Sequence, residues 1–208
     1  MKTILAALLI ISANAFSQIN IDALISETKQ IMTTLHIKIR DSIKFDGHIT
    51  FQLTTALPQG GASFLAGDEL IIGKKTITRV YKHPTMQVTK YIDSVLTNDK
   101  SPTSIKLIEA KAVLVHELCH YLQATIPKKT SLVKIKMTRK QYVGEPDEIE
   151  AHAVQSYYTF KYFDPAIIVA LKKIPIKEDI ELWEMLIDAD LITYKRPPLF
   201  NRHHLNWK

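Results

Sequence analysis

Two histidines four residues apart, His116 and His120, share a short stretch with a glutamate, Glu117, that directly follows the first. On an α-helix, residues four apart lie on the same face, so both imidazoles point toward one spot. Imidazole is a common ligand of zinc, and a neighbouring carboxylate is placed to accept a proton beside the ion. The spacing therefore predicts a zinc site on a helix.

A catalytic zinc ion normally has three protein ligands and one open position, so the two histidines need a partner elsewhere in the chain. Candidate ligands are concentrated in one later segment, EPDEIEAH, at residues 145–152. The residue types alone do not choose among them. The candidates are Glu145, Asp147, Glu148, Glu150 and His152.

The two segments together, HELCH at 116–120 and EIEAH at 148–152, resemble the gluzincin metallopeptidases, whose second helix supplies a glutamate ligand. The nearest pattern is that of the CAAX-type and HtpX-like zinc peptidases, H-E-x-x-H followed by E-x-E-A-D. Those relatives span membranes, so this chain resembles a minimal soluble member. The resemblance implies that Glu148 is the third zinc ligand, and it places His152 where the pattern has aspartate.

If Glu148 binds the ion, Glu150 faces elsewhere, because it lies about 200° away round the helix. His152 lies one turn beyond Glu148 on the same face, where it would orient a ligand, bind the ion itself or stabilise an oxyanion. Glu150 and His152 thus stay open as alternative third ligands. The tyrosines considered for an oxyanion contact are Tyr142, Tyr157 and Tyr158.

These residues predict a zinc-dependent metallopeptidase that acts on a peptide or protein substrate. Zn²⁺ held by His116, His120 and Glu148 would lower the pKa of a water molecule toward about 7. Glu117 would accept the proton of that water and pass it to the leaving amine. Two alternatives stay open: a zinc-stabilised binding or structural protein without catalysis, and a zinc amidase acting on cell-wall peptide.

The N-terminal residues have the pattern of a secretory signal peptide. Lys2 precedes an apolar run from Ile4 to Ile11 and a small-x-small cleavage pattern that ends at Ala15. The run is shorter than the roughly 20 apolar residues of a membrane helix, so we expect no transmembrane segment after signal cleavage. We expect a signal peptide at 1–15, a secreted or periplasmic protein, and a single domain at 16–208.

The chain has 208 residues and a formal net charge of +6, with a denser group of basic residues between Lys128 and Lys140. A solvated loop explains such a group more simply than a binding surface, so we expect no nucleic-acid partner. With Cys119 as the only cysteine, no intrachain disulfide can form. Stability must come from core packing and, if present, the metal, and the sequence leaves the oligomeric state open.

The elements that position the site are expected to be mainly helices. Apolar spacing predicts a helix from Ile21 to about Ile43, with Asn20 or Asp22 as its cap, and a buried helix from about Ile105 to Ala124 that carries the histidine pair. Further helices are predicted at 85–97, 144–163 and about 177–191.

Short apolar runs bounded by glycine and proline, at 48–53 and 63–73, predict strands of a small antiparallel sheet. A basic loop or short strand is expected at 132–137. The expected fold class is α+β: a mostly helical single domain with a zinc-binding helix pair and a small antiparallel sheet.

Overall fold

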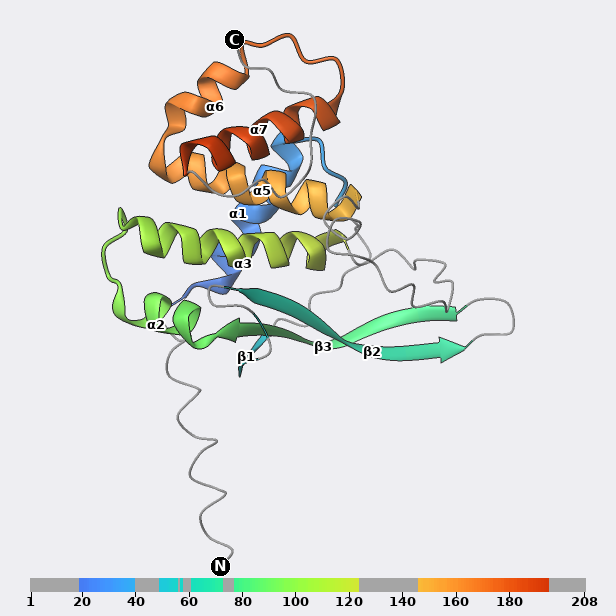
Figure 1. Cartoon of the computed structure of the whole chain (residues 1–208). Coiled ribbons are helices and arrows are strands. Elements are labelled where there is room, and N and C mark those ends of the chain that lie inside the picture. Colours follow the sequence, from blue (N-terminus) through green and yellow to red (C-terminus); the bar gives the residue numbers. More distant parts are fainter. Residues whose placement is uncertain are drawn as a thin grey trace, which may run out of the picture.

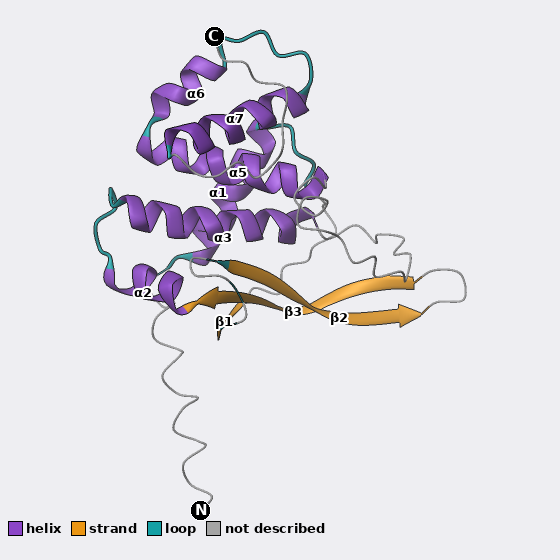
Figure 2. Cartoon of the chain, viewed as in Figure 1, coloured by secondary structure: helices purple, strands orange, loops and turns teal. Residues whose placement is uncertain are grey.

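The computed structural model of the chain describes residues 19–39, 49–55, 57, 61–72, 77–123 and 146–194, and between 64 and 84 it describes the backbone alone. Within these ranges the fold is α+β and mostly helical, as predicted, with one three-stranded sheet. The helices α1, α3, α5, α6 and α7 lie on one side of that sheet (Figures 1 and 2). The predicted signal peptide, the basic group between Lys128 and Lys140 and the predicted segment at 132–137 lie outside the described residues.

Helix α1 spans Ile21–Thr34 and ends well before the predicted Ile43. The Asn20 side chain caps its start, because Oδ1 accepts a hydrogen bond from the Ala23 amide at 2.9 Å. At its end His36 has a left-handed φ of 57°. The Ile37 amide donates to the Met32 carbonyl at 2.8 Å, which completes a Schellman-type stop. The apolar spacing continues past this stop because Leu35 is a buried core residue and Ile39 packs against the core, although the segment is no longer helical.

The sheet consists of β1 (Thr50–Thr54), β2 (Ala62–Ile72) and β3 (Ile77–Thr89) in the order β1-β3-β2. β3 was not predicted; β2 pairs antiparallel with it, and β1 pairs parallel with it. The prediction of an all-antiparallel sheet was therefore wrong. β3 lies between β1 and β2 in the sheet. The strand direction reverses from β1 to β2 and again from β2 to β3, so β3 runs in the same direction as β1. The two runs predicted within 63–73 form the single strand β2, with a register shift between Leu65 and Gly67.

Helix α2 spans only Lys90–Asn98, because the first part of the helix predicted at 85–97 belongs to β3. Met86 and Val88 are fully buried while Gln87 between them is partly exposed. This alternation is typical of a strand, but over five residues it is too short to be told from a helical pattern by sequence.

Helices α3 (Ile105–Gln123) and α5 (Pro146–Phe163) agree closely with the predicted helices. Figure 1 shows α3 between the sheet and α5. Gln123 hydrogen-bonds to the Asp147 carbonyl near one end of the pair, and His116 contacts His152 further along, so the two helices run antiparallel. This antiparallel pair is the frame of the candidate site.

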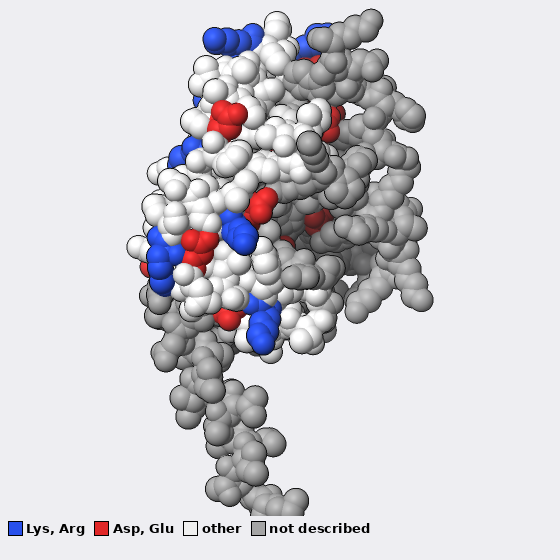
Figure 3. Space-filling view, turned by 60° about the vertical axis from the view of Figure 1, so that its left-hand side comes forward, with Lys and Arg blue, Asp and Glu red and all other residues white. Residues whose placement is uncertain are grey.

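The remaining helices cover the outer side of α5. α7 (Asp179–Thr193) overlaps the predicted last helix, and the short α6 (Pro165–Leu171), which was not predicted, begins at a proline that suits a first helical position. None of the helices in the described ranges is both long and apolar enough to cross a membrane. On the face drawn in Figure 3, basic and acidic side chains are interspersed, a pattern typical of a solvated surface.

Candidate metal centre

The two motif histidines lie side by side on the face of α3 that is turned toward α5. Their Nε2 atoms are 3.1 Å apart. His116 is 8% exposed, and the rest of this helix is largely apolar and buried. Polar rings buried in such surroundings are costly without compensating partners. The predicted convergence of the two imidazoles is therefore present.

Glu148 on α5 supplies a carboxylate to both imidazoles. Its Oε1 is 3.2 Å from His120 Nε2, its Oε2 is 3.5 Å from His116 Nε2, and the residue is 6% exposed. In tetrahedral coordination with bonds of about 2.0–2.2 Å, zinc ligand atoms lie about 3.3–3.6 Å from one another. The three side chains thus have a mutual spacing close to that of a zinc ligand set.

Gln123, which the sequence analysis did not single out, fixes the orientation of His120. Its Nε2 donates to Glu150 Oε2 at 2.6 Å, so its Oε1 must face His120 Nδ1, which lies at 3.2 Å. Since that oxygen can only accept, Nδ1 carries the ring proton. When the ring is neutral, its lone pair is therefore on Nε2, which is the tautomer that metal binding requires.

Glu150 occupies the opposite position from Glu148, as the helical spacing predicted. It binds Gln123. The group of possible metal ligands whose atoms all lie close together consists of His116, Glu148 and His152; Glu150 is outside it, and His120 is connected to it through the contacts with His116 and Glu148 given above. The signal for Gln123 was present in the sequence, because it lies three residues after His120 and seven after His116 on the same helical face. A polar residue at the predicted end of a helix, however, is usually solvated, and only the position of α5 shows that Gln123 is 4% exposed.

His152 lies against the same group. Its ring centroid is 4.5 Å from that of His116, and the ligand atoms of His116, Glu148 and His152 all lie within 4.8 Å of one another. Burial lowers the pKa of His152 most strongly, and the nearby His116 lowers it further, to about 3. The ring is therefore neutral and keeps a lone pair.

The electrostatic surroundings of the cluster favour a cation. For His120, burial alone lowers the pKa, but the hydrogen bond and charge of Glu148 and the charge of Glu117 outweigh it, so that the pKa is raised. Carboxylates that stabilise a protonated imidazole also stabilise a bound divalent ion, provided the ring is neutral. Glu117 is half-buried, and its charge contributes to the raised pKa of His120. Its carboxylate is therefore close enough to interact electrostatically with this ligand.

Two other residues of these helices lie away from the ligand cluster. Tyr157 follows His152 by five residues, about 140° round the helix, and packs against the hydrophobic core. Cys119 is fully buried in α3, where burial and then the charge of Glu150 raise the pKa of its thiol. It therefore packs as a small apolar side chain.

Comparison of the chain with protein-family models, curated protein sequences and solved structures gives no match. The resemblance to gluzincins therefore remains a prediction from two short motifs, and the case for a metal centre depends on the geometry of its own residues.

Proposed function

We propose that this protein is a zinc-dependent metallopeptidase, with zinc bound by His116, His120 and Glu148. The observation that carries the proposal is the mutual spacing of the three side chains in a buried position. The two histidine Nε2 atoms are 3.1 Å apart, and they lie 3.2 and 3.5 Å from the two carboxylate oxygens of Glu148. A carboxylate, Glu117, directly follows the first ligand in the chain. This combination suits hydrolysis better than a purely structural ion, which needs no adjacent base.

A zinc ion in this position supplies a Lewis acid that polarises a peptide carbonyl and makes a water molecule more acidic. The side chains supply the remaining functions. Glu117 takes a proton from the attacking water and delivers it to the leaving nitrogen. Gln123 holds the proton of His120 on Nδ1, and Glu148 offsets part of the positive charge between the helices.

A second candidate function is favoured by His152. Four protein ligands close a zinc site, as is usual where zinc has a structural role. His152 lies in the same ligand cluster as His116 and Glu148. If it supplies a fourth ligand, the protein is a zinc-stabilised binding or structural protein, and Glu117 has no proton to transfer.

The substitution Glu117→Gln tests the proposed function, because it removes the base and keeps the shape of the side chain. We expect one zinc per chain in both proteins and a rate of hydrolysis of an unstructured protein such as casein that falls by about 10²–10⁴-fold in the variant. The matched control is Glu184→Gln on α7, which changes a half-buried glutamate away from the site.

Two results would contradict this proposal. Full hydrolysis by Glu117→Gln would show that another group is the base. Absence of hydrolysis by the zinc-loaded wild type, together with four protein ligands in X-ray absorption spectra, would instead establish the structural role that His152 favours.

A further inference from the structure

The face of α3 that carries the histidines continues beyond the metal centre toward the start of the helix. Val113 lies three residues and Glu109 seven residues before His116. Because α5 runs antiparallel and brings His152 against His116, the residues three and seven positions after His152 face this part of α3. These residues are Gln155 and Thr159.

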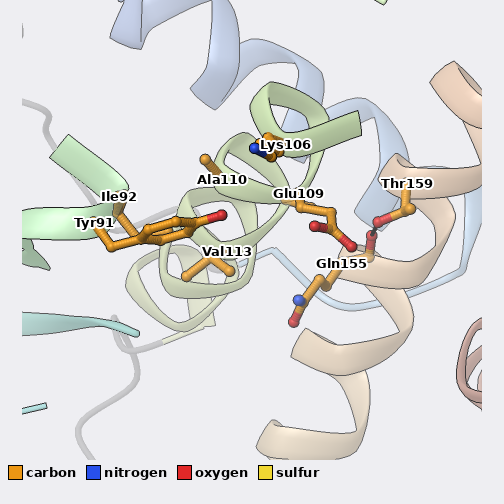
Figure 4. A pocket seen from close by; sticks show the side chains of 9 residues that line it. Tyr91, Ile92, Lys106, Glu109, Ala110, Val113, Gln155 and Thr159 are labelled. Atoms are coloured by element: carbon orange, nitrogen blue, oxygen red, sulfur yellow. Dashed lines mark hydrogen bonds between the residues drawn. The ribbon is translucent and has the colours of Figure 1, made fainter. Parts of the chain in front are cut away.

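These four side chains line a pocket of about 230 Å³, whose other walls come from α2 and α3. Figure 4 shows the Tyr91 ring lying across the pocket beside Val113, and the Glu109 carboxylate directed toward α5 near Gln155 and Thr159. Pockets for drug-sized ligands begin at about 300 Å³, so this pocket suits a single side chain better than a whole small molecule. The remaining lining residues are Ile92, Lys106, Ala110 and Ala112.

The lining combines an apolar wall with a carboxylate. Ile92, Ala110 and Ala112 are each 1% exposed and can pack only against the apolar stem of a ligand. Glu109 is half-buried, and a carboxylate has two oxygens that accept several hydrogen bonds. Lys106 also borders the pocket, but it is exposed, so water screens its charge more than that of Glu109. The lining therefore fits a long aliphatic stem that ends in a cation.

The position of Glu109 relates the pocket to the metal centre. Seven residues of α-helix separate it from His116, a rise of about 10 Å along the axis. An extended peptide advances about 3.3–3.6 Å per residue, so this distance corresponds to about three residues. Gln155 lines the pocket and follows His152 by three residues, one turn further along α5.

We propose that the pocket between α2, α3 and α5 is a subsite that binds a lysine or arginine side chain of a peptide substrate, with Glu109 as the specificity-determining residue. The bound side chain lies about three residues from the bond to be cleaved. This inference rests on the proposed peptidase function, and it names the class of substrate that the same site selects.

Peptide binding tests the subsite without requiring turnover. In the zinc-loaded Glu117→Gln protein, we measure the Kd of unstructured peptides that differ only in carrying lysine, norleucine or glutamate at one scanned position. At one position the lysine peptide is expected to bind about tenfold more tightly than the norleucine peptide, since a hydrogen-bonded charge pair is gained at a partly exposed site.

Substitutions of Glu109 in the Glu117→Gln protein decide whether this residue causes the preference for the lysine peptide. Glu109→Gln should abolish the lysine preference, Glu109→Lys should shift the preference to the glutamate peptide, and the control Glu184→Gln should leave it unchanged. Equal binding of lysine and norleucine peptides at every position, or a preference that persists in Glu109→Gln, would overturn the proposal. Thermal melting of each variant separates loss of recognition from loss of folding.

The subsite and the proposed function can fail separately. Cleavage by the wild type with no basic preference at any position refutes the subsite and leaves the peptidase function intact. A zinc-loaded wild type that cleaves nothing, but whose Glu117→Gln form shows a lysine preference that depends on Glu109, supports the subsite and refutes the peptidase function.

Discussion

At the scale of single residues, the structure adds a hydrogen-bonded chain from Glu150 through Gln123 to His120. The Glu150 carboxylate accepts from Gln123 Nε2 at 2.6 Å, which turns Gln123 Oε1 toward His120. Groups that orient a metal ligand in this way change metal affinity although they never touch the ion. Gln123 is therefore a positioning residue of the candidate centre.

Replacing Gln123 by methionine keeps the size of the side chain and removes the acceptor for His120 Nδ1. We predict a loss of zinc affinity of about 10–100-fold, measured by competition with a chromophoric chelator. The exposed Gln30→Met on α1 serves as the control. Unchanged affinity in Gln123→Met would show that the orientation of His120 does not depend on this hydrogen bond.

A site residue could be predicted from the sequence where its role depends on spacing within one helix. It could not be predicted where its role depends on how two helices pack. His116 and His120 were identified by spacing within one helix, and helical geometry also separated Glu148 from Glu150. Gln123 could not be identified, because its role depends on how α5 packs across the end of α3, which no local pattern encodes. The position of His152 among the ligands was anticipated as one of several possibilities, and the structure places it beside His116.

At the scale of elements, the long helices were predicted from the sequence, but some of their ends, the strand β3 and the short helix α6 were not. The helix pair α3 and α5 was predicted closely because long periodic segments give a strong signal. α1 was predicted too long, since Leu35 and Ile39 continue its apolar spacing after the backbone has left the helix. The parallel pairing of β1 with β3 depends on a contact between strands that are not consecutive, and the spacing within each strand carries no information about it.

The stop at the end of α1 gives a prediction for stability. His36 adopts a φ of 57°, a conformation that costs a residue with a Cβ atom about 1–2 kcal/mol and glycine much less. Its ion pair with Asp179 is 3.4 Å long but largely exposed, so its loss should matter little. His36→Gly should therefore raise the free energy of unfolding by up to about 1 kcal/mol in urea denaturation, after the larger backbone entropy of unfolded glycine is included. A lower free energy of unfolding would show that the histidine side chain stabilises this end.

At the scale of the whole molecule, the candidate centre joins two helices that are separated in the chain by residues 124–145. α3 and α5 also contribute to one hydrophobic core, in which Leu118 on α3 and Val154 on α5 are fully buried. A ligand that binds only the folded state adds stability, and at a concentration 100 times its Kd it contributes about 2.7 kcal/mol. Zinc bound between these helices should therefore stabilise the entire fold.

Metal removal tests this linkage. Treatment with EDTA should lower Tm by about 5–10 °C, given that 1 kcal/mol shifts Tm by about 2–4 °C in a protein of this size. Zinc, but not magnesium, should restore the original value, because two imidazoles are poor ligands for magnesium. His116→Ala should show no difference between the EDTA-treated and zinc-supplemented samples. An identical Tm for wild type with and without zinc would mean that no ion joins the two helices.

The most direct test of a zinc centre formed by α3 and α5 is the metal content of the purified protein, measured by elemental analysis under metal-replete conditions. We predict one zinc per chain in the wild type and in His36→Ala, which removes an exposed histidine, and a strongly reduced content in His116→Ala and Glu148→Ala. Absence of zinc from the folded wild type, or full zinc content in both ligand variants, would contradict the assignment of this site.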